Sequence, residues 1–108
     1  MEEHYAEQPS VDDLVIGDVL RALGDPVRQR IVAVLSDGEF HPCRAEEFGV
    51  PLHKSTLTHH FKVLRQSGLT QRRVVGRDHA VRLRMDDLDQ QFPGLLSAVL
   101  PALTSEGR

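Results

Sequence analysis

The segment "KSTLTHHFKVLRQSG", residues 54–68, decides the fold, because its apolar residues recur at the spacing of an α-helix. At about 100° per residue, Leu57, Phe61 and Leu64 fall on one face, and Gly68 follows as the expected left-handed stop. The opposite side carries short polar groups, namely Ser55, Thr56, Thr58, His59 and Lys62. A surface helix needs only solubility on its outer side, so this composition indicates a face that contacts a partner.

Two further helices are predicted before this segment. Residues 10–25, "SVDDLVIGDVLRALGD", begin with Ser10 in the spacing of a capping box. Residues 25–38, "DPVRQRIVAVLSDG", place Asp25 at the N-cap and Pro26 at the first helical position, where the missing N–H costs nothing. Both segments carry apolar residues at helical spacing, so each predicts a helix packed on a core.

A short third helix is predicted for residues 41–49, "HPCRAEEFG", with Pro42 near its start. In the helix of the opening segment, we expect Ser55 to be the N-cap. His60 lies close to the apolar face, which favours a packed and hydrogen-bonded imidazole rather than an exposed one.

After Gly68 the spacing of apolar residues changes from helical towards alternating. The runs "LTQRRVV", residues 69–75, and "HAVRLR", residues 79–84, predict two short strands around "GRD". The result is a hairpin with Arg77 at its tip. A last helix can begin at Asp86.

The predicted fold class is mainly α with a small β-hairpin (α+β), arranged as a dimeric winged helix-turn-helix. We expect residues 1–9 to form a flexible arm, residues 10–92 the winged-helix DNA-binding domain, and residues 93–108 a C-terminal dimerisation helix. The interface is expected to involve one apolar residue of the first helix and five of the last segment: Leu14, Leu95, Leu96, Val99, Leu100 and Leu103. The alternative is that this last segment folds back on its own chain.

Charge is distributed unevenly along the 108 residues, whose formal net charge is −3. Residues 51–84 carry eight Lys and Arg against one carboxylate, whereas residues 1–50 carry four against eleven. A local positive field of this kind favours a polyanionic partner. The single cysteine, Cys43, excludes an internal disulfide, and no signal peptide or membrane span is evident, so a reducing cytoplasmic setting is expected.

The chain resembles the ArsR/SmtB-type bacterial winged-helix regulators. The resemblance rests on "ALGDPVRQRIVAVL" (22–35), "KSTLTHHFKVLRQSGL" (54–69) and the arginine-rich hairpin ending in "HAVRLR" (79–84). It implies a homodimer that binds double-stranded operator DNA. It also implies repression, with activation as the other possibility, relieved by a metal ion or another signal.

Residues on the recognition helix and the hairpin are the expected DNA contacts. They are Lys54, Ser55, Thr56, Thr58, His59 and Lys62 on the helix, and Arg72, Arg73 and Arg77 on the hairpin, or wing. Arg82 and Arg84 lie on or near the wing too. Because strand side chains alternate between faces, we favour Arg77 and one residue of the pair Arg72 and Arg73.

A metal site would be incomplete in this sequence. Many members of the family carry Cys-x-Cys on the third helix, where this chain has His41-Pro42-Cys43. The last helix holds Asp86, Asp87 and Asp89 but no histidine. The remaining candidate ligands are His4, His41 and Cys43, which would favour nickel or zinc.

Three alternatives stay open at this point. His41-Pro42 can simply set a turn, with Cys43 buried as a small hydrophobic residue. The regulator can answer a signal other than a metal, or the winged helix can bind a protein instead of DNA. No motif in the sequence supports an enzyme.

Overall fold

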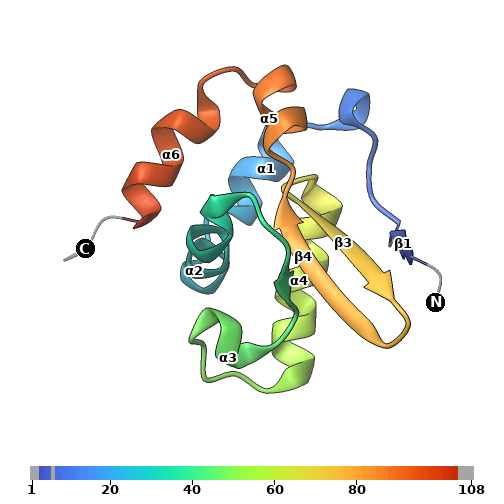
Figure 1. The fold of residues 1–108 in the computed structure, drawn as a ribbon. Coiled ribbons are helices and arrows are strands. Elements are labelled where there is room, and N and C mark those ends of the chain that lie inside the picture. The colour runs from blue at the N-terminus through green and yellow to red at the C-terminus, as the bar shows by residue number, and fades with distance from the viewer. Residues whose placement is uncertain (1–2, 6, 105–108) are drawn as a thin grey trace.

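The computed structural model describes residues 3–5 and 7–104, and Figure 1 shows how their helices and strands are arranged. A four-stranded antiparallel sheet has the strand order β1-β3-β4-β2, and the helices α2 and α4 pack beside it. The elements in chain order are β1 (Glu3–Tyr5), η1 (Val11–Asp13), α1 (Ile16–Ala22), α2 (Pro26–Val34), η2 (Leu35–Asp37), β2 (His41–Pro42), α3 (Ala45–Phe48), α4 (Lys54–Ser67), β3 (Thr70–Val75), β4 (Asp78–Leu83), α5 (Met85–Gln91) and α6 (Leu95–Thr104). The predicted winged helix-turn-helix, mainly α with a small sheet, is confirmed.

α2 begins as the sequence predicts. The side chain of Asp25 accepts hydrogen bonds from the backbone N–H groups of Val27 and Arg28, at 2.9 and 3.1 Å, and Pro26 occupies the first turn. These bonds satisfy two of the donors that a helix N-terminus leaves free. The helix passes into the single 3-10 turn η2, which ends at Gly38 with φ 78°.

α4 also forms as predicted, with one difference at its start. Leu57, Phe61 and Leu64 are buried, and Gly68 ends the helix with φ 90°. The N-cap is His53 instead of Ser55, because the extended backbone at His53 already places its carbonyl to accept from Leu57 N at 3.0 Å. Ser55 is therefore inside the first turn, and its hydroxyl is left on the outer surface.

The predicted first helix over residues 10–25 is interrupted. Ser10 donates to the carboxylate of Asp13 at 2.9 Å instead of capping a backbone N–H, and η1 is followed by extended backbone at Leu14. α1 starts only at Ile16. The interruption turns the Leu14 side chain inward, where it is buried beside Gly68.

The predicted third helix over residues 41–49 is wrong in its first half. His41 and Pro42 form the strand β2, which pairs with Val81 and Ala80 of β4. Pro42 has no N–H to donate, and a sheet edge tolerates this loss. Only Ala45–Phe48 are helical, and this short α3 ends at Gly49 with φ 65°.

Parts of the segment over residues 1–9, expected to be a flexible arm, contact the rest of the chain. Glu3–Tyr5 form β1, which pairs antiparallel with residues 73–75 of β3. The backbone carbonyl of Glu7 accepts from Arg65 Nε at 3.2 Å, and that of Pro9 accepts from Arg84 Nη1 at 2.7 Å. The segment before η1 is thus joined to the sheet, to α4 and to the start of α5.

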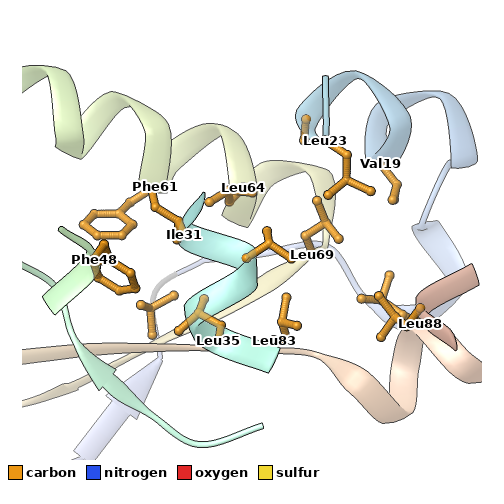
Figure 2. Close-up of a cluster of buried hydrophobic side chains, with 14 of the residues drawn as sticks. Val19, Leu23, Ile31, Leu35, Phe48, Phe61, Leu64, Leu69, Leu83 and Leu88 are labelled. Atoms are coloured by element: carbon orange, nitrogen blue, oxygen red, sulfur yellow. The ribbon is translucent and has the colours of Figure 1, made fainter. Parts of the chain in front are cut away.

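One buried cluster joins these elements (Figure 2). It includes Ile31 and Leu35 from the α2–η2 region, Leu64 from α4 and Leu83 from β4. The rings of Phe48 and Phe61 meet edge to face, with centroids 5.5 Å apart, and fix α3 against α4. This packing sets the orientation of α4, and so determines which of its side chains reach the surface.

Candidate nucleic-acid interface

α4 presents a polar outer face made of exposed residues. They are Lys54, Ser55, Thr56, Thr58, His59 and Lys62. The side chain of His53 makes no capping hydrogen bond, and the first turn of α4 contains no acidic residue. Free N–H groups and the positive end of the helix dipole are therefore directed at the same surface, an arrangement that suits an anion.

A cluster at the start of α2 holds α4 in place from behind. His60 Nδ1 lies 3.2 Å from Arg28 Nη1, and Arg28 Nε donates to the carbonyl of Ala22 at 2.7 Å. Burial lowers the pKa of His60, although the carboxylate of Asp25, 3.8 Å away, opposes this shift. A neutral imidazole can accept from Arg28 at Nδ1, so the expectation of a packed and hydrogen-bonded His60 is confirmed.

The two neighbouring arginines of the wing, Arg72 and Arg73, point to opposite faces of the hairpin, although both line the groove described below. Arg73 lies on the outer face of the hairpin, with its guanidinium 4.0 Å from the centre of the Phe40 ring. Arg82 stacks on the same ring at 4.6 Å and donates to Gln71 Oε1 at 3.0 Å. Because successive side chains of a strand alternate, Arg72 points to the other face, towards α4.

At the tip of the wing Arg77 is exposed, next to Gly76 with φ 61°. Arg84, in contrast, is buried, with only 7% of its surface exposed. Its guanidinium bonds Asp87 Oδ2 at 3.0 Å and the carbonyl of Pro9 at 2.7 Å. Arg84 is thus not placed to reach a ligand, and it was not among the wing residues favoured as DNA contacts.

An open groove of about 980 Å³ lies between the N-terminal half of α4 and the wing. It brings together five of the predicted contacts, namely Lys54, Thr58, Arg72, Arg73 and Arg77. The other four, Ser55, Thr56, His59 and Lys62, are exposed on α4 outside the lining of the groove. Arg44, just before α3, also lines it; this exposed basic residue beside the first helix of the motif was not predicted.

The comparison with known proteins agrees with this geometry. No family model matches the chain. The protein YceK of Bacillus subtilis strain 168, an uncharacterized HTH-type transcriptional regulator, is 33% identical over 89 residues, which span 82% of this chain and 89% of that protein. The chain belongs to the HTH-type transcriptional regulators. The predicted DNA-binding transcriptional regulator is thus confirmed at the level of this class. In the part of the regulator that the structure describes, no helix is long and apolar enough to cross a membrane.

The structure places two of the three candidate metal ligands, His41 and Cys43, and describes no complete metal site around them. Both ring nitrogens of His41 are engaged by carboxylates, with Nδ1 2.6 Å from Glu47 Oε2 and Nε2 2.9 Å from Asp37 Oδ2. Burial raises the pKa of the Cys43 thiol to about 11, so the free thiol is protonated at neutral pH. Among the side chains that the structure describes, no group of three from His, Cys, Asp or Glu could hold an ion.

The third candidate ligand, His4, has its backbone in β1, opposite Val74, and its side chain lies outside the described residues. Asp87 of α5, one of the aspartates noted near the C-terminus, accepts a hydrogen bond from Arg84.

The apolar residues expected at a dimer interface divide into two groups. Leu14 and Leu96 are 7% and 4% exposed in the single chain, and α6 packs on α2. Leu95, Val99, Leu100 and Leu103 are partly buried against the same core.

The exposed large apolar residues of the described chain lie instead around α1: Val15 at 53%, Ile16 at 42% and Leu20 at 52%. The sequence contained a hint of this exposed apolar group, since the predicted first helix carries apolar residues on two sides.

The two carboxylates bonded to His41 make the stability of the regulator depend on pH. Burial disfavours the imidazolium, but hydrogen bonds to Glu47 and Asp37 outweigh this and raise the pKa of His41 above its usual value. A raised pKa in the folded state contributes stability below the ordinary histidine pKa, and the contribution is lost as pH rises through the folded value. His41→Gln should therefore lower the free energy of unfolding by about 1–2 kcal/mol at pH 6 and by less at pH 9. Urea denaturation at the two pH values measures this, with the exposed His79→Gln as control; an equal loss at both would contradict the assignment.

Proposed function

We propose that the regulator is a homodimeric repressor of the ArsR/SmtB type, which inserts the N-terminal half of α4 into the major groove of operator DNA. The observation that carries the proposal is the groove in which Lys54 and Thr58 of α4 face Arg77 of the wing. A recognition helix and a wing that together place five basic side chains along one groove suit a duplex. Repression needs nothing beyond occupancy of a promoter by such a dimer.

Each exposed group has a chemistry that suits DNA. Thr58 and His59 are short enough to approach base edges, where hydroxyl and imidazole groups can hydrogen-bond and a threonine methyl can contact thymine. Lys54 and the free N–H groups at the start of α4 suit a phosphate. Arg77, at the tip of the wing, suits the backbone or the narrow minor groove.

Base contacts and phosphate contacts can be separated by substitution. Thr58→Ala and His59→Ala should each weaken binding to the preferred site by about tenfold and leave binding to random duplex unchanged, because base contacts specify the sequence. Arg77→Ala should weaken both and reduce the slope of log affinity against log salt by about one. Fluorescence anisotropy with a site selected in vitro measures all three.

The control is Gln90→Ala, an exposed change on α5, away from the groove. The wing assignment fails if Arg77→Ala leaves the salt slope and the affinity for random duplex unchanged. The assignment of α4 fails if Thr58→Ala and His59→Ala weaken specific and random DNA alike.

The exposed apolar residues of α1 support the dimer. Ile16 and Leu20 are one helical turn apart, so they form one strip with Val15 at its end. A symmetric interface buries such a strip twice, once from each protomer. Because Leu20 is half exposed in the single chain, changing it leaves the monomer core intact.

We expect the wild type to sediment as a dimer at micromolar concentration and Leu20→Glu to sediment as a monomer. Burial of a leucine side chain contributes about 1.5–3 kcal/mol, and two are lost here, so the dimer dissociation constant should rise at least about 100-fold. Operator affinity should fall with it. Gln90→Glu adds the same charge at an exposed polar position and should remain dimeric; a monomeric wild type would refute the proposal.

The second candidate function is a protein-interaction module, which the apolar strip on α1 would equally serve. Salt dependence discriminates between the two. DNA binding should weaken with a slope of about −0.9 per phosphate neutralised, whereas a partner bound through the apolar strip should respond weakly to salt.

The signal that relieves repression is proposed to be something other than a metal at His41 and Cys43. The two carboxylates on His41 and the protonated Cys43 support this choice.

A further inference from the structure

The groove between α4 and the wing has an apolar floor as well as a cationic wall. Pro42, Cys43, Leu57 and Phe61 line it below, beside the guanidinium of Arg72. A surface that only followed a DNA backbone would have no need of an apolar floor. Its volume is about 980 Å³, and it is open to solvent.

Arg72 is the unusual group in this groove. It lies on the inner face of the wing, opposite Val81 of β4, and its Nε is buried without a hydrogen-bond partner among the described residues. Its charge is close enough to Arg65 to help burial lower the pKa of that guanidinium. The neighbouring Cys43 thiol is protonated, so it does not balance the two positive charges.

The whole lining carries an excess of positive charge. Five basic side chains, including Arg44, line the groove against two carboxylates, Glu46 and Asp78. A carboxylate is planar and can accept two parallel N–H bonds from one guanidinium, so it suits an arginine that lines the groove, such as Arg72. The apolar floor then favours a carboxylate attached to a hydrocarbon or aromatic body.

We infer that this groove binds a small organic carboxylate, with the acid group at Arg72 and the apolar body against Leu57 and Phe61. The inference deepens the proposed function and rests on it in one respect, which is that the ligand releases DNA. Lys54, Thr58 and Arg77 line the same groove, so a ligand and a duplex would compete for them. A ligand that binds only the DNA-free form shifts the equilibrium by its full binding free energy.

Binding is tested first without DNA. 2-Naphthoate, 2-naphthol and inorganic phosphate are titrated into the wild-type protein at pH 7, followed by calorimetry and by NMR of the full chain. 2-Naphthoate should bind once per chain and shift the signals of Cys43 and Phe61. 2-Naphthol, which lacks the acid group, should bind at least tenfold more weakly, and phosphate, which lacks the apolar body, should shift neither signal.

Two variants locate the acid group. Arg72→Gln should abolish the preference for 2-naphthoate over 2-naphthol, and Arg72→Lys should restore part of it, because lysine keeps the charge but loses the planar fork. Arg82→Gln is the matched control, since Arg82 stacks on the outer face of the same hairpin and does not line the groove. The NMR shifts of the wild type keep the test valid if either Arg72 variant folds poorly.

Competition with operator DNA is then measured separately. Release of the duplex by 2-naphthoate but not by 2-naphthol supports the inference. It is overturned if 2-naphthoate binds no tighter than millimolar, if phosphate binds equally well, or if Arg72→Gln keeps the preference. DNA binding without 2-naphthoate binding refutes this site alone; 2-naphthoate binding without DNA binding refutes the proposed function and keeps the site.

Discussion

Gly68→Ala is expected to lower the free energy of unfolding by about 2–4 kcal/mol. Gly68 ends α4 with φ 90°, a conformation that costs alanine about 1 kcal/mol more than glycine. An added Cβ would also collide with Cδ2 of Leu14, which is buried, so the core has to shift. Overpacking of this kind costs about 1–3 kcal/mol. Urea denaturation followed by circular dichroism measures the sum.

Gly94 provides a matched control for this substitution. Its φ is 88°, nearly the same, but an added Cβ would have nothing within 4 Å. Gly94→Ala should therefore cost only the conformational part, about 1 kcal/mol. In a double-mutant cycle, Leu14→Ala should remove part of the cost of Gly68→Ala, because it removes the collision. Equal losses for Gly68→Ala and Gly94→Ala would show that Leu14 does not pack against Gly68.

The second large effect is expected at Arg84. Arg84→Met should lower the free energy of unfolding by about 2–4 kcal/mol, because it leaves the carbonyl of Pro9 and part of the Asp87 carboxylate without their donor. Asp87 is 39% exposed, so water compensates for some of the loss. The N-terminal segment should also become more susceptible to proteolysis, since Arg84 joins it to α5 across 75 residues of sequence.

Arg77→Met is the matched comparison for Arg84. Arg77 is exposed at the wing tip, so the same substitution should leave the free energy of unfolding within about 0.5 kcal/mol of the wild type. The two substitutions should thus affect different properties. Arg84→Met should change the stability, and Arg77→Met the salt dependence of DNA binding. If Arg84→Met left the stability unchanged, its buried contacts would be of no consequence for folding.

Elements with strong local signals could be predicted from the sequence. α2 has its N-cap at Asp25 and α4 its stop at Gly68, and both are local devices that act within a few residues. The hairpin followed from alternation around a glycine. The interruption at Leu14 and the strand at His41–Pro42 could not be predicted, because each depends on a distant partner, namely Gly68 and β4.

The candidate site shows the same division. The exposed face of α4 followed from helical spacing, since burial of Leu57 and Phe61 fixes what remains outside. The separation of Arg72 from Arg73 required the register of β3 against β4. The burial of Arg84 required a contact with Pro9, which no local pattern in a basic strand can reveal.

The two shortest strands have a consequence for how copies of the regulator can meet. β1 covers residues 73–75 along one side of the wing, and β2 covers Ala80 and Val81 along the other. An uncovered strand edge is a template for adding another chain, and very short flanking strands with a proline are a common way to block it. With Pro42 on one flank and β1 on the other, the wing is a poor site for strand addition between molecules. The covered edges thus disfavour pairing between the wings of two molecules, which agrees with the proposed dimer contact through the helices.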